Sequence, residues 1–216
     1  MSEALTARPS TAPLAREFAK KGGVEFHCVD APNEVDEAPG VAAYYGGPYL
    51  GWLEFANTRT GQAVLKESLD DAMEYIDEIV EEDGPFDGIL GFSQGATIAF
   101  CYLHHRLRTR PFDPPLMPFA CAIFISASGT EKDQGTLVEY IGSTGRSITI
   151  PTLHVYGKED DNSEAATTMY KHCGAGGDAE FLLHPNGHNI PSDVDSVQRI
   201  VKAFKAIERK SATRLA

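Results

Sequence analysis

The sequence has few of the features that direct a chain to a disulfide scaffold, a metal site or a membrane. Its four cysteines, Cys28, Cys101, Cys121 and Cys173, are far apart and show no metal-ligand spacing. No run approaches the roughly 20 apolar residues that span a bilayer, and the first residues contain no apolar signal core. We therefore expect no metal, no cofactor and no membrane partner, and a cytoplasmic protein with reduced thiols.

Positive charge is also scarce. The chain has 19 Lys and Arg residues against 31 Asp and Glu residues, a formal net charge of −12. Nucleic-acid binding rests on clustered Lys and Arg, so this balance argues against a nucleic-acid partner and favours a small neutral substrate. Much of the acid falls within residues 70–83, where apolar residues recur at helical spacing. We interpret that block as the solvated face of a helix.

One pentapeptide, Gly91-Phe92-Ser93-Gln94-Gly95, follows an apolar run and precedes the small-residue run that begins at Ala96. This order predicts a strand, a sharp turn and a helix, with glycines where a strained turn and a close helix approach leave no room for side chains. The turn would display Ser93 as a nucleophile, and the backbone N–H of Gln94 would stabilise an oxyanion at the helix start. The alternative is a strand-to-helix loop that happens to hold a serine.

The length of 216 residues fits one domain with a substantial core. We expect a loose tail over residues 1–12 and a single α/β domain over residues 13–210, with a mostly parallel sheet flanked by helices. The predicted strands cover residues 24–29, 86–90, 120–126, 152–156 and 179–183, and the predicted helices cover residues 13–21, 60–82, 163–173 and 194–207 with one more after the pentapeptide.

The segment from Asn33 to Asn57 combines Pro and Gly punctuation with many aromatic residues. Long irregular segments in compact domains are often functional, so these rings can wall a pocket for an apolar substrate. They can equally fill the edge of the core. The candidate substrate-binding residues are Tyr44, Tyr45, Tyr49 and Trp52.

A nucleophilic serine needs a base, and the base needs an acid that holds its tautomer. Asp160 follows one predicted strand and His188 follows the next, which gives the order Ser, Asp, His along the chain. Asp161 and Glu159 remain rivals for the acid, because spacing alone does not separate them from Asp160. The other histidines lie on or next to predicted strands and helices, where we expect structural roles: His27, His104, His105, His154, His172 and His184.

These residues carry a resemblance. The stretch from Gly84 to Gly95, the stretch from His154 to Asp160, and the stretch from His184 to Pro191 resemble the family of serine hydrolases similar to yeast FSH and human ovarian-cancer-associated gene 2 proteins. The resemblance implies an α/β-hydrolase fold and a triad of Ser93, Asp160 and His188 that cleaves carboxylic esters or thioesters. Fungal members resemble esterases and thioesterases of polyketide gene clusters, which implies an apolar acyl or polyketide thioester, carried on a polyketide synthase, in secondary metabolism.

One departure stands out. Members of the family begin with a strand that leads into a Leu-His-Gly-type loop, and this loop donates the second oxyanion N–H. No such segment precedes Pro13, so we expect either a shortened gene model or a natural variant. The strand expected at residues 24–29 must then leave a gap beside the strand that ends at Gly91, pair with it directly, or take a strand from elsewhere. The alternative function is a weakened or inactive relative that binds a ligand or partner.

Overall fold

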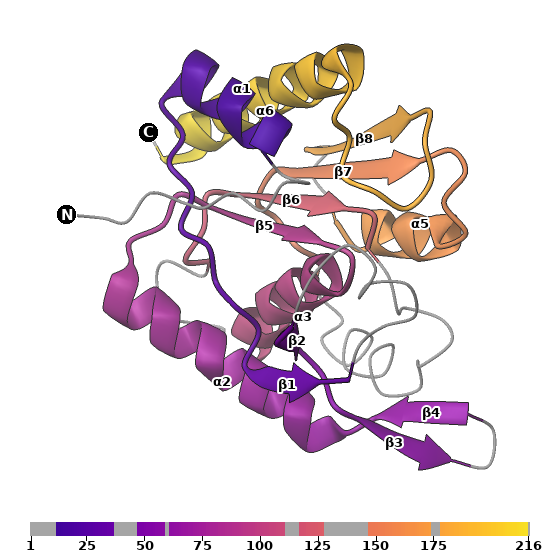
Figure 1. The fold of residues 1–216 in the computed structure, drawn as a ribbon. Helices are drawn as coiled ribbons and strands as arrows, with labels where there is room; N and C mark the ends of the chain where they lie inside the picture. The colour runs from indigo at the N-terminus through magenta and orange to yellow at the C-terminus, as the bar shows by residue number, and fades with distance from the viewer. Residues whose placement is uncertain are drawn as a thin grey trace.

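A parallel four-stranded sheet forms the centre of the protein in the computed structural model (Figure 1), which describes residues 12–36, 47–58, 61–110, 117–127, 147–173 and 178–215. The strands are β5 (Gly88–Phe92), β6 (Cys121–Ile125), β7 (Thr152–Gly157) and β8 (Ala179–His184), in the order β5-β6-β7-β8. All residues of β6 and β7 are buried, as their continuous apolar runs predicted. The predicted α/β architecture and four of its five strands are confirmed.

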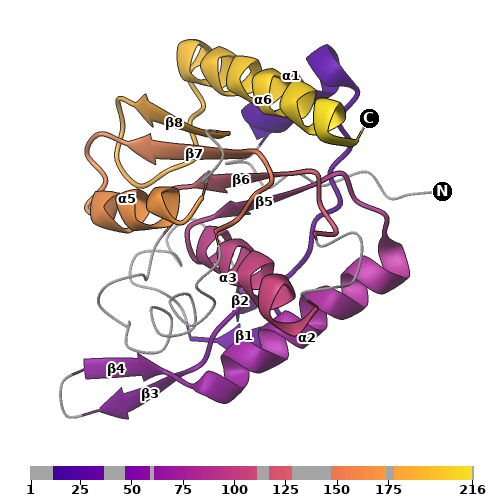
Figure 2. The ribbon, with the colours of Figure 1, turned by 180° about the vertical axis from the view of Figure 1, so that it is seen from behind.

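Helices cover both faces of this sheet. Figures 1 and 2 place α2 (Lys66–Asp83), α3 (Gln94–Thr109) and α5 (Ser163–Lys171) on one face, with α1 (Ala12–Gly22) and α6 (Val194–Leu215) on the other. Two apolar clusters match the two faces. Phe100 and Phe124 belong to the first, and Phe18 and Ile200 to the second. The last helix extends beyond the predicted end at residue 207, and the Ser211 hydroxyl donates to the carbonyl of Ala120 at 2.8 Å.

Two short antiparallel hairpins precede α2. The strands β1 (Asn33–Val35) and β2 (Tyr49–Gly51) pair with each other, as do β3 (Phe55–Thr58) and β4 (Gly61–Val64). The predicted helix start at residue 60 is therefore wrong. Val64 pairs with Phe55, and the extended Leu65 donates its N–H to Glu54 before the helix begins at Lys66. Apolar residues at positions 64 and 65 suit a strand end as well as a helix face, so periodicity did not separate the two.

The strand predicted at residues 24–29 does not form. These residues join no ladder in the described part of the chain, and there β5 pairs only with β6. Val24 and Phe26 instead pack on the apolar cluster of α1 and α6, with the Phe18 and Phe26 rings 5.7 Å apart. A strand needs a neighbour to accept its backbone hydrogen bonds, and no strand of the described residues pairs with this segment. The three expected outcomes all assumed a strand at residues 24–29, so none of them occurs as stated, and β6 is the neighbour of β5 among the described residues.

Among the described residues, no helix is both long and apolar enough to cross a bilayer. The same residues contain no group of three or more His, Cys, Asp or Glu side chains arranged to hold a metal ion. The division into a tail and one domain stays a prediction.

Candidate active site

The turn between β5 and α3 displays Ser93. Its backbone has φ 53° and ψ −124°, a strained conformation that few residues other than glycine adopt. The Ser93 N–H donates to the carbonyl of Ile125 at 3.0 Å, which ties the turn to β6. A Cβ at Gly91 would clash with the backbone of Gly95 and Ala96, so only glycine permits the helix to approach the strand this closely. The predicted strand, turn and helix are present.

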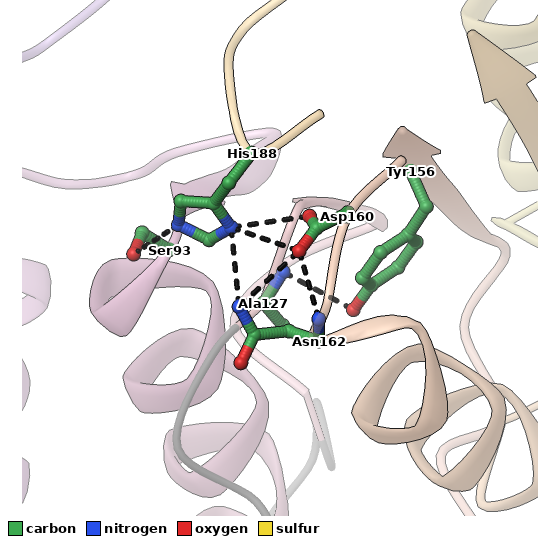
Figure 3. Close-up of polar contacts among 6 residues, drawn as sticks. All are labelled: Ser93, Ala127, Tyr156, Asp160, Asn162 and His188. Atoms are coloured by element: carbon green, nitrogen blue, oxygen red, sulfur yellow. Dashed lines mark hydrogen bonds and ion pairs between the residues drawn. The ribbon is translucent and has the colours of Figure 1, made fainter. Parts of the chain in front are cut away.

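Three side chains from three loops meet at this turn (Figure 3). His188, in the loop after β8, places Nε2 2.9 Å from Ser93 Oγ. Its Nδ1 lies 3.1 Å and 3.2 Å from the two carboxylate oxygens of Asp160, which follows β7. A proton on Nδ1 satisfies the carboxylate and leaves the Nε2 lone pair for the serine hydroxyl. The structure thus brings Ser93, Asp160 and His188 together in one hydrogen-bonded chain.

Close packing of two loops positions the acid and the base. Gly157 ends β7, and a Cβ there would clash with the carbonyls of Asn186 and Gly187 in the loop that carries His188. The loops are also joined by a hydrogen bond from the Glu159 N–H to the Asn186 carbonyl, at 3.3 Å. The phenyl ring of Phe92 lies 5.4 Å from the His188 ring and covers one side of it. His188 is therefore held by backbone contacts as well as by its partners.

Asp160 is 4% exposed, and its charge is compensated locally. Burial alone would raise the pKa of this carboxyl, but hydrogen bonds from Asn162 and the nearby His188 outweigh it and hold the pKa below its usual value. Asn162 donates its backbone N–H to Asp160 Oδ1 at 2.9 Å and its side-chain Nδ2 to the same oxygen at 3.2 Å. Sequence reasoning missed Asn162, although an Asp that accepts from the residue two positions later is a common turn.

The rivals for the acid lie elsewhere. Glu159 and Asp161 are both exposed, while Asp160 is the carboxylate beside His188. His184, the last residue of β8, is fully buried, and burial lowers its pKa. The geometry separates Asp160 from its neighbours, which spacing alone did not.

Comparisons with known proteins show the family of the chain. Residues 9–200 match the family described as Serine hydrolase (FSH1). The chain belongs to this family. It is accordingly an enzyme of the serine hydrolase class with an α/β-hydrolase fold, as the resemblance implied.

Relatives within this serine hydrolase family include fungal enzymes. The chain is 29% identical to the esterase FPY3 of Fusarium mangiferae over 208 residues, covering 93% of this chain and 89% of that one. It is 29% identical to the hydrolase phiM of Talaromyces stipitatus over 200 residues, with 90% and 79% covered. A third relative, family of serine hydrolases 2 of Saccharomyces cerevisiae, is 30% identical over 189 residues, with 82% and 78% covered.

Solved structures share the fold of this hydrolase. Arabidopsis thaliana SOBER1 superposes with a TM-score of 0.54 at 18% identity, covering 92% of each chain. A carboxylesterase from Mesorhizobium loti superposes with a TM-score of 0.55 at 14% identity, covering 90% of this chain and 81% of that one. At these identities the likeness extends to the fold alone.

The remaining predicted site residues of this hydrolase lie in two regions. Gln94 is the first residue of α3. Its backbone N–H therefore has no hydrogen-bond partner within the helix, as is general for the first turn. Its side-chain Oε1 accepts the N–H of Trp52 at 2.9 Å. Trp52 is half-buried against the core beside Gly95, and Tyr49 is half-buried in β2. Tyr44 and Tyr45 lie outside the described residues.

Proposed function

We propose that this chain hydrolyses carboxylic esters or thioesters of apolar acyl chains through a triad of Ser93, His188 and Asp160. The observation that carries the proposal is the unbroken chain of short contacts, 2.9 Å from Ser93 Oγ to His188 Nε2 and 3.1 Å from His188 Nδ1 to Asp160 Oδ2. A nucleophile, a base within hydrogen-bond reach and a carboxylate that orients the base are the parts that nucleophilic catalysis by serine requires.

In the first half-reaction, Ser93 Oγ attacks the acyl carbon while its proton moves to His188 Nε2. The carbonyl oxygen becomes an oxyanion, and the imidazolium that forms is stabilised by the Asp160 carboxylate. The oxyanion then re-forms the carbonyl and expels the alcohol or thiol, which takes the proton from Nε2. The products of this half-reaction are an acyl-enzyme on Ser93 and the free leaving group.

In the second half-reaction, a water replaces the leaving group. His188 Nε2 accepts a proton from this water as its oxygen attacks the acyl carbon, and Nε2 then returns the proton to Ser93 Oγ. The carboxylic acid leaves and the triad is restored. The Gln94 N–H at the start of α3 donates to the oxyanion in both half-reactions, with the helix dipole adding to the stabilisation.

Residues beside the turn at Ser93 support an apolar acyl substrate. Trp52 packs beside Gly95 and Tyr49 lies in the same short segment, so an apolar acyl chain matches this wall better than a charged one. Fungal relatives named as esterases support an ester substrate. We further propose that a polyketide-type thioester on a carrier of a polyketide synthase is the substrate in a cytoplasmic, secondary-metabolic setting.

Steady-state hydrolysis of p-nitrophenyl esters and acyl thioesters tests the proposal. Ser93→Ala, His188→Ala and Asp160→Asn should each remove most of the activity, by about a thousandfold or more, because triad members act as a unit. Asp161→Asn is the matched control, since it removes a neighbouring but exposed carboxylate. Full activity in Ser93→Ala would refute the triad. A folded wild-type protein that hydrolyses none of these substrates would support the alternative of an inactive, ligand-binding relative.

A further inference from the structure

Asn162 lies beside the acid and the base of the site and contacts both (Figure 3). It occupies the cap position before α5, yet its side chain makes no capping hydrogen bond to that helix. The side-chain Nδ2 instead donates to Asp160 Oδ1 at 3.2 Å, next to the backbone N–H donation at 2.9 Å. His188 Nδ1 lies 3.2 Å from the same Oδ1 and 3.1 Å from Oδ2, so the amide and the imidazole share this carboxylate. The Asn162 side chain thus binds the Asp160 carboxylate and does not cap α5.

The orientation of this amide follows from its two neighbours. Nδ2 also lies 3.4 Å from His188 Nδ1, and both nitrogens are donors in the tautomer that leaves Nε2 open for Ser93. They therefore form no hydrogen bond with each other in that tautomer. Rotation of the amide would place its carbonyl oxygen against the carboxylate oxygen Oδ1 and lose the bond to it. The NH₂ group consequently keeps its positive end toward both Asp160 and His188 Nδ1.

We propose that Asn162 is a positioning residue. It aligns the Asp160 carboxylate and weakens the stabilisation that this carboxylate gives to the His188 imidazolium. The inference rests on the proposed triad and adds a fourth residue to it. Each hydrogen bond to Oδ1 withdraws negative charge from the carboxylate, and the positive end of the amide dipole opposes the positive charge of an imidazolium. Nδ1 carries its proton throughout the reaction, so both effects act on the positive charge that forms when Nε2 takes the serine proton.

Other titratable groups near this pair come from three elements. Tyr156 in β7 has its hydroxyl bonded to the Ala127 N–H at 3.1 Å, His184 ends β8, and Asp193 lies just before α6. Asp193 is occupied by the Ser196 N–H at 2.8 Å, and burial lowers the pKa of His184. Asp160 and Asn162 are the residues with atoms within hydrogen-bond distance of His188 Nδ1, so a change at Asn162 acts directly on that nitrogen.

The test is the pH profile of kcat/KM, measured from pH 4.5 to 9.5 for wild type, Asn162→Ala, Asn162→Asp and the control Asp161→Asn. Removal of the amide should move the midpoint of the acid limb upward by about half a pH unit, which lowers kcat/KM on that limb about threefold. Asn162→Asp adds a second carboxylate beside the imidazole, and the upward shift should reach about one unit, or tenfold. Asp161→Asn should leave the midpoint in place.

Thermal unfolding and Ser93→Ala separate the possible outcomes. A merely structural role predicts a lower melting temperature and a loss of kcat/KM that is equal at every pH, and this result would overturn the inference. A wild-type midpoint in both Asn162 variants would overturn it as well. Full activity in Ser93→Ala would instead refute the triad itself, so a failure of the proposed function is recognised independently of Asn162. A graded upward shift in the order wild type, Ala, Asp supports the inference.

Discussion

The backbone N–H of Trp52 donates to the side-chain Oε1 of Gln94 at 2.9 Å. This bond joins two segments 42 residues apart, and it attaches the irregular aromatic stretch to the helix that starts beside Ser93. Asn33 adds a second link by donating its side-chain Nδ2 to the Trp52 carbonyl at 3.3 Å. Gln94 therefore has two groups at the proposed site: its side chain holds Trp52, and its backbone N–H is the oxyanion donor of the proposed mechanism.

The first prediction separates these two roles. Gln94→Leu keeps the backbone N–H but removes the acceptor for Trp52, which leaves a part-buried donor unpaired at a cost of about 1–3 kcal/mol. KM for long-chain esters should rise several-fold, whereas kcat for acetyl esters should change little. Steady-state kinetics over a series of acyl lengths measures both. An equal fall of kcat at all lengths would mean that the side chain acts on the chemical step.

The second prediction concerns the Trp52 ring. Trp52→Ala deletes the indole ring beside Gly95, which is part of the proposed acyl site, so it should reduce kcat/KM most for the longest acyl chains, by about tenfold or more, and least for acetyl esters. The same substrate series measures this effect. An equal loss at every chain length, together with a lower melting temperature, would indicate that the ring only packs the core against Tyr75, whose ring lies 6.3 Å away.

A third prediction tests the packing that carries His188. Gly157→Ala inserts a methyl group against the carbonyls of Asn186 and Gly187, so the loop must move. A displacement of about 1 Å in the base costs on the order of a hundredfold in rate, while overpacking costs about 1–3 kcal/mol of stability. Gly95→Ala is the control for folding, because its nearest neighbour, Trp52 Nε1, lies at an ordinary 3.6 Å. Wild-type turnover in Gly157→Ala would contradict the account of the loop.

The sequence predicted which three side chains meet beside the turn at Ser93 better than it predicted the structure around them. Ser93, Asp160 and His188 each follow a strand of the parallel sheet, and parallel strands end at one edge, so order and spacing were enough to bring them together. The choice of Asp160 over Asp161 needed coordinates, because adjacent residues of a turn point in different directions. Asn162 was missed for the same reason.

The remaining errors come from residues whose pattern fits two structures. Val64 and Leu65 continue the apolar period of α2, yet pairing with β3 holds Val64 in a strand. Val24 and Phe26 alternate with polar residues, as residues of a strand do. Such alternation indicates only that one side of the segment is buried, and it does not show that a neighbouring strand is present. Long-range pairing decided both cases, and local sequence does not encode it.

The fourth prediction follows from a buried histidine. His154 is fully buried, its Nδ1 has no hydrogen-bond partner among the described residues, and burial lowers its pKa from 6.5 to about 3. His154 therefore binds a proton below pH 6.5 in the unfolded chain, whereas in the folded state it binds one only below about pH 3. The free energy of unfolding should fall as the pH drops across this window, with a loss of about 3 kcal/mol by pH 4.5 from this group.

Urea unfolding at pH 7.5, 6.0 and 4.5 measures this dependence. His154→Gln replaces the imidazole by a group that does not titrate, so its stability should fall less between pH 7.5 and 4.5 than that of the wild type. Burial also lowers the pKa of His104, to about 4. This group accounts for part of the pH dependence of the free energy of unfolding that remains in His154→Gln. A slope unchanged by His154→Gln would show that the imidazole is charged or solvated within the fold.

The most direct test of an activated Ser93 is the reaction of the protein with a fluorophosphonate, followed by intact-mass measurement and peptide mapping. An activated serine loses its proton to the neighbouring base and attacks phosphorus, whereas an ordinary serine does not react. We predict one adduct per chain, located on Ser93, absent from Ser93→Ala and formed far more slowly in His188→Ala and Asp160→Asn. A folded wild-type protein that stays unlabelled, or an adduct that persists in Ser93→Ala, would contradict the account.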